Sequence, residues 1–215
     1  MAWSFLAVLF AVYLIRVSTW ENWYYNDKEG SERAMTVSSI ATSQDLSEEE
    51  PSDVQKTEHI VPADHPRYLT IEKIGVNKAR VVSVGINQKN QLGTPNNIFD
   101  VGWYDSSAKP GMNGTVLMDG HNGGPSKYGV FKRLPELAPG DIISVERGDG
   151  VVFKYRVTEN KTVALNEADS YMTTAMKSPE KGKQSITLIS CTGDWSDQQK
   201  TYLSRQFTRA VLVEE

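Results

Sequence analysis

The sequence predicts a single mostly-β domain, a barrel or a sandwich, in the C-terminal part of the 215-residue chain. From about residue 68, short runs of β-type residues alternate with turns rich in Gly, Pro, Asn and Asp, as they do in small all-β folds. Asp149-Gly150, between two such runs, is a strong signal for a β-hairpin. Hydrophobic residues make up 39% of the chain, which permits a globular core.

Residues 1–25 precede this domain as a membrane anchor or a signal segment. Residues 2–15 are almost entirely apolar but are short for a membrane span, which needs about 20 residues. We favour a retained anchor because no small-x-small cleavage site is evident. Aromatic residues of the kind found at membrane interfaces also follow the run, namely Trp20, Trp23, Tyr24 and Tyr25.

Residues 26–65 form an acidic segment that we predict to be a flexible linker. Between residues 26 and 58, nine acidic residues stand against three basic ones. A segment rich in Ser, Thr, Glu and Gln buries too little apolar surface to offset the entropy that it would lose on ordering. The rest of the chain is close to neutral and carries no basic stripe, so nucleic acid is not an expected partner.

Seven runs in residues 66–215 have the composition of strands and define the predicted domain. They are residues 68–74, 79–86, 115–119, 141–146, 151–159, 185–191 and 205–213. Between the runs 151–159 and 185–191, residues 166–177 are the best helix candidate, with Asn166 as the N-cap and Ser178-Pro179 as the end. Residues 131–134 are predicted to form a short helical turn.

Cys191 is the only cysteine of the chain and ends the apolar run 185–191. One cysteine cannot form an internal disulfide, and a metal site usually needs several Cys or His ligands at short spacing. The thiol is therefore either a small buried hydrophobic group or a nucleophile. Alternation places Thr187, Ile189 and Cys191 on one face of the strand. Cys191 then points toward a surface groove if the opposite face lines the interior of the domain.

A nucleophilic thiol needs a basic neighbour, and His121 is the best candidate among the three histidines. It follows the apolar run 115–119 after one glycine and precedes a glycine-rich turn, so it lies just past the end of a strand. His59 and His65 lie in segments without a strand pattern, and we predict both to be solvated. A lone loop histidine is more often structural than catalytic, but a cysteine at another strand end favours the catalytic interpretation.

Arg205 opens the last run, and Arg209 lies on the same face of it. An arginine at the start of a strand is usually exposed to solvent. The functional alternative is a fixed cation near Cys191 that holds a developing oxyanion or orients a carbonyl group.

Together these stretches resemble the sortases, the surface transpeptidases of Gram-positive type. Residues 187–191 (Thr-Leu-Ile-Ser-Cys) are similar to the Thr-Leu-x-Thr-Cys signature of the family, and Gly120-His121 is similar to its Gly-His motif. Arg205 matches the third catalytic residue. Residues 69–76, 101–111 and 131–141 also resemble family segments, so the resemblance covers roughly residues 66–215.

The resemblance implies a closed eight-stranded β-barrel with short helices in the loops and a groove lined by His121, Cys191 and Arg205. It implies a membrane-anchored cysteine transpeptidase that cleaves an LPxTG-like sorting signal of secreted proteins between Thr and Gly. A thioacyl enzyme then passes the protein to an amine acceptor such as a cell-wall precursor. This activity requires the catalytic domain to lie outside the cytoplasm. No acidic cluster suited to calcium is evident, so neither a metal nor another cofactor is expected.

Ser190 departs from the family pattern because it stands where Thr is usual. Its hydroxyl is retained, and Ser190 and Asn122 are candidate substrate-binding residues. Arg209 competes with Arg205 for the catalytic role, and Arg205 is preferred because residues 205–213 match the final strand of the family in length. Residues 102–104 (Gly-Trp-Tyr) and the short tail look closest to the housekeeping-like classes D, E or F.

Other cysteine enzymes fit the sequence less well. Papain-like peptidases place Cys before His along the chain, and L,D-transpeptidases resemble Ser-His-Gly-Cys at the nucleophile, whereas this chain has Leu-Ile-Ser-Cys. The main alternative is a membrane-tethered β-domain for surface adhesion, with Cys191 as a buried core residue. A reactive and partly exposed thiol favours the enzyme.

Overall fold

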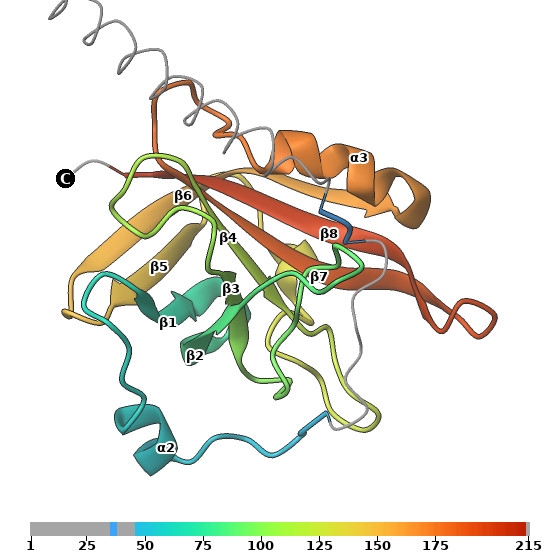
Figure 1. Ribbon diagram of the computed structural model, residues 1–215, viewed down its shortest axis with the longest axis horizontal. Helices are drawn as coiled ribbons and strands as arrows, with labels where there is room; N and C mark the ends of the chain where they lie inside the picture. Colours follow the sequence, from blue (N-terminus) through green and yellow to red (C-terminus); the bar gives the residue numbers. More distant parts are fainter. Residues whose placement is uncertain (1–34, 38–45, 214–215) are drawn as a thin grey trace, which may run out of the picture. The chain divides into compact units, whose positions relative to one another are not determined.

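Eight strands in the part of the chain that the structure describes close into a barrel, in the order β1-β2-β3-β4-β7-β8-β6-β5 (Figure 1). The structure is a computed structural model, and it describes residues 35–37 and 46–213. The strands are β1 (Pro66–Ile71), β2 (Val76–Val84), β3 (Val101–Tyr104), β4 (Thr115–Gly120), β5 (Ile142–Arg147), β6 (Val152–Ala164), β7 (Ser185–Ser196) and β8 (Thr201–Leu212). The barrel confirms the predicted mostly-β fold and its eight strands.

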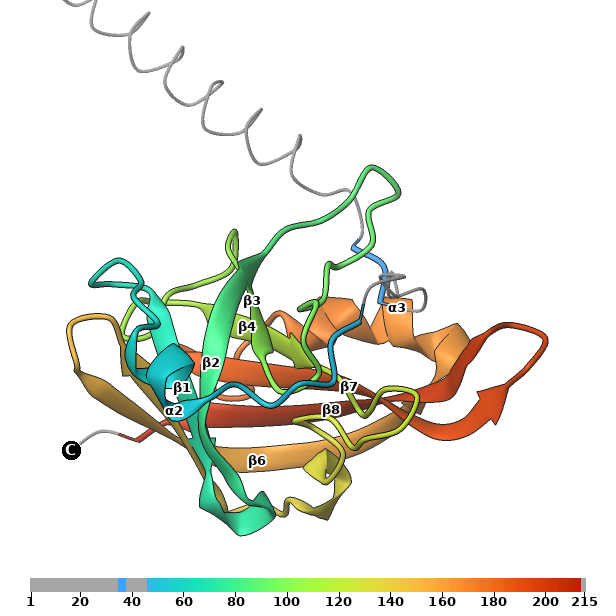
Figure 2. The same cartoon turned by 90° about the horizontal axis from the view of Figure 1, so that it is seen from below.

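Two parallel pairings interrupt an otherwise antiparallel barrel. They join β2 to β3 and β4 to β7, and the pairing of β1 with β5 closes the ring. The hairpin predicted at Asp149-Gly150 is present, since β5 and β6 pair antiparallel across it and Gly150 has a positive φ of 84° that glycine adopts without strain. β7 and β8 lie side by side and project beyond their neighbours as a long hairpin (Figure 2).

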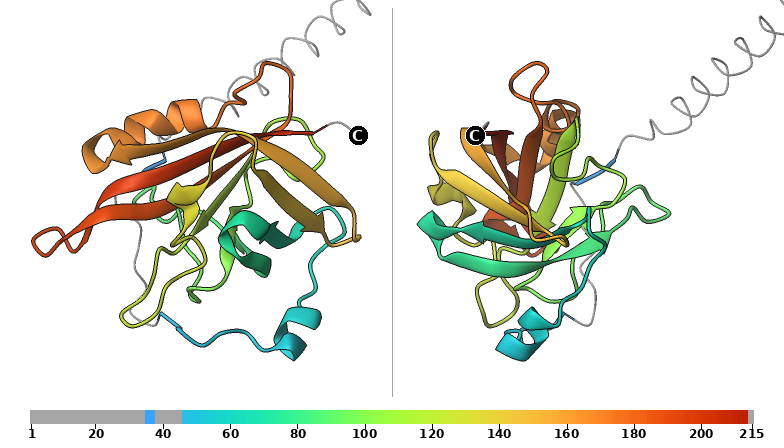
Figure 3. Two further views of the ribbon diagram at one scale, coloured as in Figure 1. Left: turned by 180° about the vertical axis from the view of Figure 1, so that it is seen from behind. Right: turned by 90° about the vertical axis from the view of Figure 1, so that its left-hand side faces the viewer.

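The described residues contain two α-helices, α2 (Asp53–Thr57) and α3 (Leu165–Ala175), and two 3-10 turns, η1 (Glu72–Ile74) and η2 (Leu134–Glu136). α3 links β6 to β7 and lies outside the barrel against β6 and β8 (Figure 3). The predicted helix is therefore present, but its N-cap is Ala164 and not Asn166, because β6 continues directly into the helix.

Two apolar clusters divide the buried residues. The first fills the barrel and includes Met118 of β4, Leu188 of β7 and Ala210 of β8. The second lies outside the barrel wall, under α3, and includes Ile189 and Phe207. Because neighbouring residues of one strand belong to different clusters, Leu188 faces the interior and Ile189 faces outward. Cys191 has the same parity as Ile189, which confirms its predicted outward direction.

Several strand boundaries differ from the predictions. β3 was not among the seven predicted runs, because only four residues form it and one of them is Gly102. β6, β7 and β8 are longer than predicted, since their ends carry polar residues that have no β signature of their own. These polar extensions are held by pairing with a neighbouring strand, for example Trp195 with Tyr202.

Residues 46–65, from the predicted linker, make ordered contacts with the barrel. Glu48 accepts hydrogen bonds from the backbone N–H groups of Ser126 and Lys127 at 2.8 and 3.0 Å. His59 binds the Val81 carbonyl at 2.8 Å, and the His65 ring packs edge-on against Trp103 at 4.9 Å between centroids. Both histidines are half-buried, so the expectation that they are solvated is wrong.

The predicted membrane anchor at residues 1–25 and the first part of the linker lie outside the described residues. Among the residues that are described, no helix is long and apolar enough to cross a membrane. The domain boundaries at residues 25 and 65 therefore stay a prediction.

Candidate active site

Cys191 and Arg205 face each other across two neighbouring strands. They are register partners in the antiparallel pair of β7 and β8. Residues that face one another in such a pair extend their side chains on the same side of the sheet. Arg205 is fully buried, whereas Cys191 is partly exposed. The strand pairing thus fixes a cation beside a thiol that solvent can reach.

His121 joins them from β4, on the other side of β7. The parallel register of β4 and β7 runs through Asp119 and Ile189, and His121 and Cys191 each follow two residues later along the chain. The Ser190 hydroxyl donates a 2.9 Å hydrogen bond to the carbonyl of Gly120, which holds the two strands together at this point. Three adjacent strands therefore bring together the three residues that the sequence places far apart.

The His121 ring has a fixed tautomer when it is neutral. Its Nε2 donates a hydrogen bond to the carbonyl oxygen of Pro95 at 2.8 Å, because a carbonyl can only accept. The Nδ1 atom is then the basic nitrogen. Burial lowers the pKa of His121 because it disfavours the imidazolium, and the bond to Pro95 counters this only in part.

The thiol of Cys191 is also held in its neutral form. Burial raises its pKa, the positive charge of Arg205 lowers it, and the nearby Asp119 carboxyl group raises it. With the pKa of the thiol raised and that of the imidazole lowered, the resting pair is thiol and neutral imidazole. Proton transfer from the thiol to the imidazole would convert this pair into thiolate and imidazolium, the charged forms that nucleophilic attack requires.

The guanidinium of Arg205 is held by main-chain oxygens. It donates to the carbonyls of Tyr202 and Ser204 at 3.0 Å each, and its Nε donates to the carbonyl of Val37 at 2.8 Å. The last contact shows that this arginine can bind the carbonyl group of an extended peptide at the edge of the site.

Arg209 is engaged elsewhere, although it shares a strand face with Arg205. It forms a 2.6 Å ion pair with Glu159 and donates to the carbonyls of Thr174 and Lys177 at the C-terminal end of α3, at 3.0 and 2.9 Å. Its register partner on β7 is Thr187, four residues before Cys191. The geometry therefore places Arg205, and not Arg209, beside the thiol.

The two candidate substrate-binding residues, Ser190 and Asn122, have different surroundings. Ser190 is buried, with its hydroxyl turned to Gly120, so it is a strand contact within the site's scaffold. Asn122 follows His121, is buried, and lines a small pocket with the glycine-rich turn and Tyr202. Asn122 thus lies at the border of the site, and Ser190 holds β7 and β4 together beneath it.

Asp119 is a feature of the site that the sequence predictions missed. It is 2% exposed and lies on the face of β4 that carries His121. Neither carboxylate oxygen has a hydrogen-bond partner among the described residues. Its carboxyl group occupies the space that a side chain at Gly102 of β3 would fill. Burial raises the pKa of Asp119 well above its usual value, because it favours the protonated form of the carboxyl group. The sequence signal that could have identified Asp119 is an ionisable residue within an otherwise apolar strand.

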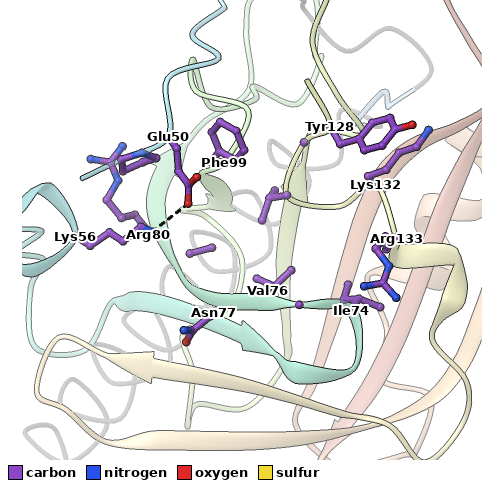
Figure 4. Close-up of a pocket in the computed structure, with 15 residues that line it drawn as sticks. Glu50, Lys56, Ile74, Val76, Asn77, Arg80, Phe99, Tyr128, Lys132 and Arg133 are labelled. Atoms are coloured by element: carbon purple, nitrogen blue, oxygen red, sulfur yellow. Dashed lines mark ion pairs between the residues drawn. The ribbon is translucent and has the colours of Figure 1, made fainter. Parts of the chain in front are cut away.

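Within the described residues, no group of three or more His, Cys, Asp or Glu side chains is arranged to hold a metal ion. A pocket of about 430 Å³ lies apart from the three residues, between the start of β2, the segment around Lys56 and the stretch after His121 (Figure 4). Three of its cationic side chains have carboxylate partners: Arg80 binds Asp100, Arg133 binds Glu136, and Lys56 lies 3.5 Å from Glu50. The fourth, Lys132, lies over the ring of Tyr128 at 5.0 Å from its centroid.

Comparison with known proteins gives the family. The model of the sortase domain matches residues 69–213. Similar solved structures include a pilus-related sortase C of Group B Streptococcus, with a TM-score of 0.53, 18% identity and coverage of 85% of this chain and 80% of that one. Sortase C of Streptococcus pneumoniae gives a TM-score of 0.52, 18% identity and coverage of 82% of each chain.

A lid mutant of sortase A from Corynebacterium diphtheriae gives a TM-score of 0.51 at 21% identity, covering 75% of this chain and 76% of that one. No curated protein sequence matches the chain. At these identities the solved structures show a shared fold, whereas the domain model extends over more than half of the chain. The chain therefore belongs to the sortase family, and this membership supports a cysteine transpeptidase.

Proposed function

We propose that this protein cleaves an LPxTG-like sorting signal between Thr and Gly and transfers the N-terminal product to an amine acceptor on the cell surface. The observation that carries the proposal is the convergence of Cys191, His121 and Arg205 from three adjacent strands. A thiol with a basic imidazole and a fixed cation is the set of groups that acyl transfer through a thioester requires.

In the first half of the reaction, the thiol proton passes to His121 and the sulfur of Cys191 attacks the Thr carbonyl carbon. The negative charge that develops on the carbonyl oxygen is stabilised by a positive group, the role assigned to Arg205. When the tetrahedral intermediate collapses, the C–N bond breaks and the imidazolium of His121 gives its proton to the leaving amine of Gly. The products are a thioester on Cys191 and the released C-terminal fragment.

The second half reverses these steps with a different amine. The acceptor amine attacks the thioester carbonyl, loses its proton to His121, and expels the thiolate of Cys191. A new amide joins the two molecules, and the thiolate regains the proton from the imidazolium. If water attacks instead, the product is the free acid, which is hydrolysis as a side reaction. An amine of a cell-wall precursor is the proposed acceptor.

The setting of Arg205 favours a part in binding the substrate main chain as well as the oxyanion. Its contact with the Val37 carbonyl has the geometry that a substrate carbonyl would need. The subclass D, E or F remains our assignment from the sequence. No metal or other cofactor takes part in the proposed reaction.

We also propose that residues 1–25 anchor the protein in the cell membrane by one span, with the catalytic domain outside the cytoplasm. The support is the apolar run at residues 2–15 with its flanking aromatic residues, together with a substrate that is a secreted protein. Fractionation of cells that express the full chain, with protease added from outside, tests both the anchor and its orientation. A soluble or protected catalytic domain would contradict this topology.

The alternative function is surface adhesion by a tethered β-domain in which Cys191 is inert. The partial exposure of the thiol does not favour this alternative, because a core cysteine is fully buried. A peptide-library cleavage assay separates the two. The proposal expects cleavage of LPxTG-like members by the native protein and none by Cys191→Ala that is folded by circular dichroism. If the two proteins cleave equally, Cys191 is not the nucleophile. If neither cleaves any member, the enzymatic function is rejected.

A further inference from the structure

Residues 36 and 37 lie against the barrel as an extended peptide that contacts Arg205, the register partner of Cys191. Thr36 donates its N–H to Asn90 at 2.8 Å and accepts from the N–H of Leu92 at 3.1 Å. Val37 turns its polar groups toward Asp169 and Arg205, since its N–H donates to Asp169 Oδ1 at 2.7 Å and its carbonyl accepts from Arg205 Nε at 2.8 Å. All four main-chain polar groups of these two residues are therefore bound by the domain.

The side chain of Val37 fills an apolar hollow on the same face. Val37 is 0% exposed and belongs to the outer apolar cluster. This cluster includes Ile189, two residues before Cys191, and Phe207, two residues after Arg205. An extended main chain held by hydrogen bonds, with one side chain in an apolar pocket, is the way in which grooves bind peptides.

Asp169 is the residue of this arrangement to which the proposed reaction gives no role. It lies on α3, and its carboxylate accepts a hydrogen bond from the N–H of Val37. The carbonyl of Val37 accepts from Arg205. It also lines an open pocket of about 440 Å³ between the start of α3 and the β7–β8 hairpin, with Asn166 and Leu203. A peptide chain bound at Asp169 can therefore continue past the position of Val37.

We propose that Asp169 is a substrate-positioning residue, which together with Arg205 holds the N–H and the carbonyl of one residue of the peptide substrate. In the absence of substrate, Thr36 and Val37 occupy this place. The proposal rests on the proposed cleavage of a peptide, because the same groove has to receive that peptide. It follows that substrate and residues 36–37 compete for one set of contacts.

The first test weakens the competitor in the full-length chain. Val37→Gly removes a buried side chain, and Val54→Gly makes the same change at a valine that is 61% exposed on α2. We expect Val37→Gly to lower the KM for a fluorogenic LPxTG peptide about tenfold with little change in kcat. Alkylation of Cys191 by iodoacetamide without substrate should also accelerate. Val54→Gly should change neither quantity. If Val37→Gly leaves both unchanged, residues 36–37 do not occupy the groove.

The second test concerns Asp169 and uses the Val37→Gly background, because in the native chain a change at Asp169 weakens substrate and competitor together. Asp169→Ala should raise KM by roughly fivefold to tenfold while kcat stays nearly constant, since a hydrogen bond common to ground state and transition state is lost. Asp169→Asn retains an oxygen acceptor and should restore most of the affinity. Glu167→Ala, an exposed residue on the same helix, is the matched control.

The outcomes separate this proposal from the cleavage on which it rests. An unchanged KM in the Asp169→Ala variant, or an Asp169→Asn variant as impaired as Asp169→Ala, would overturn the role of Asp169. If no variant cleaves the peptide but Val37→Gly accelerates alkylation of Cys191, the proposed cleavage fails and the occupation of the groove by Val37 stands.

Discussion

The thiol of Cys191 and the imidazole of His121 lie in surroundings that oppose their charged forms. Burial raises the pKa of Cys191 and lowers that of His121. Among the residues that the structure describes, Arg205 is the positive charge that acts in the opposite direction and lowers the pKa of the thiol. The pair is therefore neutral over the range between the two pKa values, and only a minor fraction carries the reactive charges.

This arrangement predicts a broad, bell-shaped dependence of kcat/KM on pH. The acidic limb should lie below 6.5, the ordinary pKa of His, and the alkaline limb above 9.0, the reference pKa of Cys. The plateau arises because the neutral pair and the ion pair carry the same total number of protons. Peptide cleavage measured from about pH 5 to pH 10 tests this. A narrow bell with both limbs between those two values would contradict the assignment of the neutral resting pair.

Arg205 and Arg209 should differ sharply when each is replaced by Ala. Arg205→Ala removes the cation beside the thiol and should lower kcat/KM by roughly a hundredfold or more. Arg209→Ala breaks the ion pair with Glu159 and the contacts with the end of α3, so its main effect should be a lower melting temperature. Steady-state cleavage and thermal unfolding of both variants decide between them. A greater loss of kcat/KM in Arg209→Ala would show that the wrong arginine was chosen.

Asp119 should make the protein less stable as the pH rises. The pKa of this buried acid is higher in the folded chain than the 3.8 of the unfolded one, so the folded state holds the proton more tightly. The contribution of Asp119 to the free energy of unfolding is then greatest near and below pH 3.8. It falls by about 1.4 kcal/mol per pH unit as the pH rises toward the pKa of the folded state.

Asp119→Asn removes this ionisation and should raise the free energy of unfolding at neutral pH relative to the native protein, with little gain near pH 4. The pKa of the Cys191 thiol should also fall, because the ionised form of the Asp119 carboxyl group raises it. Urea unfolding at two pH values and the pH dependence of alkylation measure these two effects. Asp105→Asn, at an exposed aspartate, is the control. Loss of stability that is equal at both pH values would contradict the burial of a neutral acid.

The segment around Glu48 and the loop after His121 form one connected element. The Glu48 carboxylate accepts the N–H groups of Ser126 and Lys127 and the hydroxyl of Ser126, and its backbone carbonyl accepts from Lys127 Nζ at 3.0 Å. These hydrogen bonds lower the pKa of Glu48. A side chain at Gly124 would collide with Glu48. The segment before the barrel thus restrains the loop that starts at His121.

Glu48→Ala should therefore loosen residues 123–128 without unfolding the barrel. We expect faster hydrogen exchange at the backbone N–H groups of Ser126 and Lys127, because they lose their acceptor. Glu49→Ala is the matched control, since Glu49 is exposed and lies one residue further along the chain. Hydrogen exchange followed by mass spectrometry on peptides from the loop gives the answer. Equal protection in Glu48→Ala and the native protein would show that the loop is held by other contacts.

For the whole molecule, the predicted fold class is correct because hydrophobic alternation and turn residues are local signals. The single Asp149-Gly150 pair located a hairpin that the structure contains. The number of strands and the closure of the barrel came from the family resemblance, because the short strand β3 and the polar ends of β7 and β8 carry no local signal. Those parts become strands through pairing with neighbours distant in sequence.

The candidate site was predictable to a smaller extent. Cys191 and Arg205 stand at the end and the start of predicted runs, although the structure places them within β7 and β8, and His121 directly follows β4. Motif spacing was therefore sufficient to name the three candidate residues. Asp169 and Val37 were not found, because their contact joins residues 132 positions apart. The predicted flexibility of residues 46–65 rested on composition, which does not reveal that a carboxylate such as Glu48 binds two backbone N–H groups of a loop.

The central claim is that Cys191 forms a thioester with the substrate, and intact-mass spectrometry of the full chain during peptide turnover tests it most directly. The account predicts an adduct with the mass of the N-terminal cleavage product, mapped to Cys191, that disappears when an amine acceptor is added. Folded Cys191→Ala should give neither adduct nor cleavage. Cleavage by Cys191→Ala, or an adduct mapped to any other residue, would contradict the account.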